Sequence, residues 1–171
     1  MILPDLNKLL EYKNPAVLKL YVQNYPKNKL TAEAAFTEVL KYLWLCQKHR
    51  IDSEQNENNP NFPRLVFMPR SMREIDEMWH EFILFTEAYS NFCAEYFGEY
   101  MHHLPNIFDN MPSPRDEVER DIENLLPYIY QNLDEETVRT WFCSFLDSAA
   151  EEPLQAEQGE NIQGERELAL V

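Results

Sequence analysis

The chain has 171 residues, 44% of them hydrophobic and 13% aromatic, and a formal net charge of −15. This length and apolar content suit one domain with a real core, while the excess of acid opposes binding to nucleic acid or to anionic membrane surfaces. Only three glycines occur, which argues against turn-rich β architecture and against a glycine-rich phosphate loop.

Location is inferred from the N-terminus and the cysteines. The first residues show no cationic flank, long apolar region or small-residue cleavage site, so we expect a cytoplasmic protein. Cys46, Cys93 and Cys143 lie in apolar helical patterns, and free buried thiols are the expected state. No apolar run approaches the roughly 20 residues of a membrane span.

The first third of the chain contains two helix starts. Asn14 before Pro15 is typical of an N-cap followed by the first helical residue. Thr31 is the expected cap of a longer helix that ends near His49, and this histidine is expected at the surface, where it complements the helix dipole. A polar, asparagine-rich loop and a short apolar run fill residues 52–68.

Further helix starts follow in the middle and the last third. Ser71 and Glu74 fit a capping box, which predicts a helix from Met72, and Gly98 is a natural C-cap for the helical region that follows. A second start signal precedes a helix over 117–130, which Pro127 should kink or divide. Asp134 is the expected cap of a last helix.

These patterns predict an all-α fold: a compact single-domain bundle of about five to seven helices over residues 1–147. From residue 148 onward the chain carries six Glu and no aromatic residue. We therefore expect 148–171 to be a disordered acidic tail, and its deletion to leave the melting temperature almost unchanged.

The residues with the strongest chemical character are in the segment Asp76–Pro105, which holds three of the four histidines. In one unbroken helix His80 and Cys93 would lie roughly 20 Å apart, at about 1.5 Å per residue. A shared site with Cys93 or with the histidines at 102 and 103 therefore requires a helix break, which we predict at Phe85–Thr86, with Thr86 as the N-cap of the second helix.

A family resemblance supports that break. The segment resembles a signature of uncharacterised bacterial proteins, which are similar in turn to the plant glycine-rich domain proteins. The residues concerned are Trp79, His80, Leu84, Tyr89, Cys93, Gly98, His102, His103, Leu104 and Pro105. The plant pattern has a proline at the position of Thr86, which implies a helix boundary, and a histidine at the position of Phe82. The resemblance covers about 35 residues and implies no established activity.

Three interpretations of His80 stay open. It could be a buried neutral imidazole bonded to Asp76 or Glu77, and it could share a metal site for zinc or iron with His102 or His103 and with Cys93 or Asp76. Both interpretations place His80 in the interior. Acid–base or thiol catalysis is the third.

Three functional classes correspond to these patterns. The first is a cytoplasmic interaction or scaffold domain organised around a Trp-His helix pair, with a protein partner. The second is a zinc- or iron-binding protein, including a metal-dependent enzyme. The third is a secreted bacterial effector, because an acidic tail with an apolar end resembles some type IV translocation signals.

Overall fold

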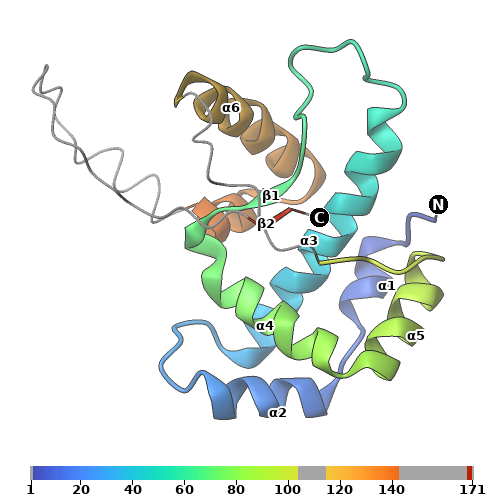
Figure 1. Ribbon diagram of the computed structural model, residues 1–171, viewed down its shortest axis with the longest axis vertical. Helices are drawn as coiled ribbons and strands as arrows, with labels where there is room; N and C mark the ends of the chain where they lie inside the picture. Colours follow the sequence, from blue (N-terminus) through green and yellow to red (C-terminus); the bar gives the residue numbers. More distant parts are fainter. Residues whose placement is uncertain (1, 104–114, 143–168, 171) are drawn as a thin grey trace, which may run out of the picture.

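The computed structural model describes residues 2–103, 115–142 and 169–170. The fold is all-α, as predicted (Figure 1). Its elements are α1 (Leu6–Leu10), α2 (Pro15–Asn24), α3 (Ala32–Ser53), β1 (Phe67–Met68), the 3-10 helix η1 (Arg70–Met72), α4 (Arg73–Leu84), α5 (Thr86–Tyr96), α6 (Arg115–Asn132) and β2 (Ala169–Leu170). Residues 135–142 are helical as well.

The long helix α3 runs through the middle of the molecule (Figure 1). It contacts α1, α2 and α4, and α4 in turn contacts α2 and α5. Figure 1 shows α2 at one end of this assembly and α6 at the other. Tyr42 of α3 and Trp79 of α4 are both fully buried where these two helices meet, with ring centroids 5.8 Å apart.

Local capping explains where most helices begin. The side chains of Asn14, Thr31 and Asp134 each accept a hydrogen bond from the backbone amide three residues later, as the sequence predicted. Helix α3 continues past the predicted end to Ser53. The short helix α1, capped by Asp5, was not predicted, because five residues carry too little periodicity to identify.

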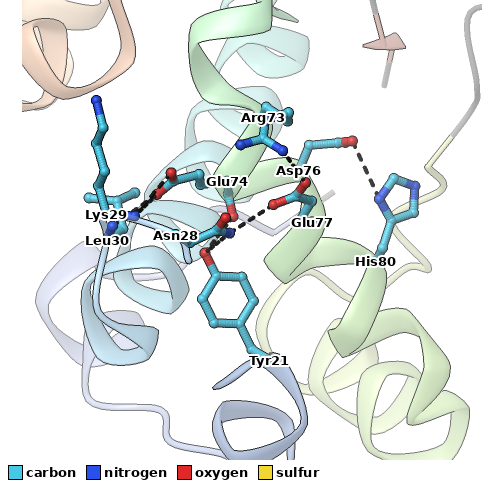
Figure 2. A network of polar contacts seen from close by, with 9 residues as sticks. All are labelled: Tyr21, Asn28, Lys29, Leu30, Arg73, Glu74, Asp76, Glu77 and His80. Atoms are coloured by element: carbon cyan, nitrogen blue, oxygen red, sulfur yellow. Dashed lines mark hydrogen bonds and ion pairs between the residues drawn. The ribbon is translucent and has the colours of Figure 1, made fainter. Parts of the chain in front are cut away.

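The predicted capping box at the start of α4 does not form, and the helix begins one residue later than expected. Both of its polar side chains have distant partners instead. Ser71 Oγ donates to the carbonyl of Trp141. The Glu74 carboxylate accepts from the amides of Lys29 and Leu30 at 2.8–3.1 Å, so it ties the loop before α3 to α4 (Figure 2).

The predicted helix break is confirmed at Phe85, whose φ of −83° and ψ of 62° lie outside the helical region. Thr86 is the first residue of α5 and makes no cap hydrogen bond, so its predicted role as the N-cap is wrong. The Phe85 amide still donates to the Phe82 carbonyl, while the Phe85 carbonyl accepts from the amide of Tyr89. Both backbone polar groups of Phe85 are therefore hydrogen-bonded despite the break.

The last third of the chain differs from expectation at Pro127. Helix α6 continues through this proline, so the proline does not divide the helix, and the kink predicted as the alternative stays a prediction. Within 148–171 the structure describes Ala169–Leu170, which pair antiparallel with Phe67–Met68. Cys143 and the predicted boundary at residue 147 lie outside the described residues, and the disorder expected for the tail stays a prediction.

Candidate functional site

The site begins with two residues one turn apart on α4. His80 Nδ1 lies 3.3 Å from Asp76 Oδ2, and Figure 2 shows the two side chains side by side along the helix. This contact follows from helix geometry, because residues four apart lie on the same face. It leaves the other carboxylate oxygen of Asp76 for a second partner.

That partner is His103, which comes from the segment after α5. Its Nε2 lies 2.8 Å from Asp76 Oδ1, and its ring centroid is 4.5 Å from that of His80. Asp76, His80 and His103 each offer one possible ligand atom, and these atoms all lie within 4.8 Å of one another. We call these three residues the histidine–aspartate cluster.

Two backbone features bring His103 to α4. The break at Phe85 directs α5 away from the axis of α4, and Gly98 then turns the chain with a φ of +72°, a conformation that favours glycine. Residues 99–103, here called the return segment, lead back to α4. Glu99 anchors the start of this segment on α3 through an ion pair of 3.1 Å with Arg50.

Beneath the cluster lies a buried pair of hydrogen bonds. Trp79 Nε1 donates to the Tyr89 hydroxyl at 3.0 Å, and this hydroxyl donates to the Met101 carbonyl at 2.6 Å. Trp79 and Tyr89 are fully buried, and the Trp79 ring lies 4.2 Å from that of His103. Burial raises the pKa of Tyr89 well above its usual value, so the phenol stays protonated and can donate.

The three cluster residues differ in exposure. The His80 side chain is 53% exposed, that of Asp76 27% and that of His103 8%. The expected interior position of His80 is therefore wrong. The apolar residues of α4 form one stripe at helical spacing, and His80 lies on the opposite face; the stripe consists of Ile75, Met78, Trp79 and Phe82.

The two other candidate ligands lie elsewhere. Cys93 is fully buried and bonds with Tyr89 and the backbone of Met101, and burial raises its pKa. Its thiol is not among the ligand atoms that converge on the cluster, and its raised pKa opposes formation of the nucleophilic thiolate. His102 is exposed, and its ring packs on Tyr100 at 4.8 Å. The structure thus brings together three of the five predicted site residues.

Two further polar residues have partners outside the cluster. Glu77, the alternative partner of His80, bonds to Arg73 at 3.0 Å and to Asn28 at 2.8 Å (Figure 2). His49, expected at the surface, is buried: its Nε2 lies 2.7 Å from the Pro63 carbonyl. The loop that folds over the end of α3 covers this histidine. The surface position was predicted from the nearby helix end alone, which gives no information about such a loop.

The donor set of the cluster suits a transition metal. Two imidazole nitrogens and one carboxylate oxygen are the ligands of three-residue zinc sites and of the facial triad that holds non-haem iron. Ligand atoms around tetrahedral zinc are about 3.3 Å apart, given bonds of about 2.0 Å. The cluster atoms lie within 4.8 Å of one another, a limit somewhat wider than that spacing, and the exposure of His80 leaves room for water beside them.

A cleft of about 760 Å³ lies between the end of α3, the 56–63 loop and α6. Two of its charged groups pair with each other: the Asp52 carboxylate accepts a hydrogen bond from Lys48, and it also accepts one from the Tyr128 hydroxyl. Asn124, another lining residue, donates to the Pro60 carbonyl and so ties the loop to α6. The cleft shares no residue with the histidine–aspartate cluster.

Comparison with known proteins gives a match to a family, over part of the chain. No curated protein and no solved structure is similar enough to this chain to match it. None of the described helices is long and apolar enough to cross a membrane. Residues 57–125, less than half of the chain but including the whole cluster, match the UCP032817-like family, which is uncharacterised.

Proposed function

We propose that the protein binds a divalent transition metal, zinc or iron, through Asp76, His80 and His103. The observation that carries this proposal is the convergence of three ligand atoms within 4.8 Å of one another, from two segments separated by a helix break. A set of two histidines and one carboxylate leaves at least one coordination position open. Metal binding at a partly open site is therefore the function that the geometry supports best.

The open position suggests what the metal would do. A metal ion held by three protein ligands binds water, lowers its pKa and polarises carbonyl or phosphoryl oxygens. His80 and Asp76 form the exposed side of the cluster, so a small molecule can reach it, whereas His103 is enclosed. A metal-dependent enzyme is the natural extension of the proposal.

The test is elemental analysis of protein purified without a polyhistidine tag, followed by titration with Zn²⁺. The wild type is expected to contain one zinc or iron per chain. Since its side chain is exposed, His80→Ala should fold normally and lose the metal. The matched control is His102→Ala, which removes an exposed histidine next to the cluster and should keep the metal. Metal-free wild-type protein with no affinity for Zn²⁺ would contradict the proposal.

A second candidate is a cytoplasmic helical interaction domain organised around the Trp-His pair. The contact of the Trp79 and His103 rings, with the buried bonds of Tyr89 behind them, supports it as a purely structural arrangement. In that case Asp76 would serve only to orient the two imidazoles. A metal-free protein whose melting temperature is unaffected by Zn²⁺ would favour this candidate over the first.

A relation to the plant glycine-rich domain proteins is part of the proposal. Their proline would fall on Thr86, the first residue of α5, where a fixed φ suits the start of a helix. Their additional histidine would fall on Phe82, which is fully buried and packs on Phe36 at 5.1 Å and on Tyr89 at 5.0 Å. The change at this position therefore removes no ligand from the cluster described here.

A further inference from the structure

The return segment is held at three points along its length. Glu99 pairs with Arg50 on α3, the Met101 carbonyl accepts from Tyr89 on α5, and His103 bonds to Asp76 on α4. The first contact is an exposed ion pair, and such pairs contribute little to stability. The contact at Met101 is buried and short. It therefore fixes the backbone of the return segment two residues before His103.

The geometry of the segment links Met101 to His103. In extended backbone, residues two apart point to the same side and the residue between them points to the other. The burial pattern follows this rule: Met101 is buried, His102 is exposed and His103 is again enclosed. A shift of the backbone at Met101 would therefore move the His103 imidazole relative to Asp76.

We infer that Tyr89 is a positioning residue for the metal ligand His103, an inference that rests on the metal-binding function proposed above. Its hydroxyl fixes the Met101 carbonyl while its own orientation is fixed by Trp79 Nε1. Tyr89 does not belong to the cluster and acts only through the backbone two residues before His103. Groups that hydrogen-bond directly to metal ligands typically change metal affinity about 10- to 100-fold when they are removed, and we expect an effect within this range for Tyr89.

The test compares two tyrosines that lose the same group. Tyr89→Phe removes the hydroxyl between Trp79 and Met101. Tyr21→Phe is the matched control, because Tyr21 is also buried, donates to the Glu74 carbonyl and accepts from Asn28. Glu74 and the ligand Asp76 both lie within α4, where the hydrogen bonds of the helix hold the backbone without this contact. We expect the Kd for Zn²⁺ to rise about 10- to 100-fold in Tyr89→Phe and to stay unchanged in Tyr21→Phe. The visible absorption of the Co²⁺-loaded protein should change only in Tyr89→Phe.

The outcomes separate this inference from the proposed function. A wild type that binds no Zn²⁺ removes both. If Tyr89→Phe binds Zn²⁺ as tightly as the wild type does, the inference about Tyr89 is overturned while the proposed metal site stands. If Tyr89→Phe does not fold, hydrogen exchange of the wild type decides. Because coupling is reciprocal, Zn²⁺ should slow amide exchange in residues 101–103, and unchanged exchange rates there would overturn the inference.

Discussion

Trp79→Ala is expected to lower the free energy of unfolding by about 3–5 kcal/mol, the usual cost of removing a large buried aromatic side chain. Trp79 is fully buried between the Tyr42 ring at 5.8 Å and the His103 ring at 4.2 Å. Its removal also leaves the Tyr89 hydroxyl without its donor. Urea denaturation followed by circular dichroism measures the effect.

A matched control for this prediction is Tyr130→Ala, which truncates an aromatic residue that is 58% exposed. We expect this change to alter the free energy of unfolding by no more than about 0.5 kcal/mol. A similar loss of stability in the two variants would mean that Trp79 does not occupy the centre of the packing between α3, α4 and the return segment.

His103→Ala is expected to abolish binding of Zn²⁺ and also to lower the free energy of unfolding of the metal-free protein by about 1–3 kcal/mol. Both effects follow from its position, because the side chain is 8% exposed, bonds to Asp76 and packs on Trp79. His80→Ala should abolish binding too, yet change the stability of the metal-free protein by less than about 0.5 kcal/mol, since its side chain is 53% exposed.

This asymmetry is measured by Zn²⁺ titration and by denaturation in the presence of a chelator. His102→Ala is the control for both readings, because it should bind Zn²⁺ normally and remain stable. Equal stability of the His103 and His80 variants would contradict the enclosed position of His103. If either variant still binds Zn²⁺ tightly, the histidine replaced in that variant is not a metal ligand.

Much of the fold could be predicted from local signals. Helix caps were predictable because the capping side chain bonds to a backbone amide only three residues later, as it does at Asn14, Thr31 and Asp134. The break before α5 was predicted at the right place from a Thr86 cap and from the proline of the plant pattern, but the cap hydrogen bond does not form. The capping box of Ser71 and Glu74 failed because residues far away in sequence, Trp141 and Leu30, supply better partners.

The site was predictable in composition but not in detail. The need for a helix break identified the region in which His80 and His103 could meet, and they do meet there. The exposure of His80 could have been predicted from the sequence, because the apolar residues of α4 lie on the other face of the helix. The many aromatic residues of the segment instead suggested that His80 was buried. The choice between His102 and His103 depends on how the return segment docks, and spacing alone does not determine it.

The most direct test of the proposed metal site is X-ray absorption at the zinc edge of the wild-type protein loaded with one equivalent of Zn²⁺. Coordination by Asp76, His80 and His103 predicts a first shell of nitrogen and oxygen at about 2.0–2.1 Å, with the outer-shell scattering of two imidazoles. A sulfur shell at about 2.3 Å would indicate a cysteine ligand, and this would contradict a site made of Asp76, His80 and His103.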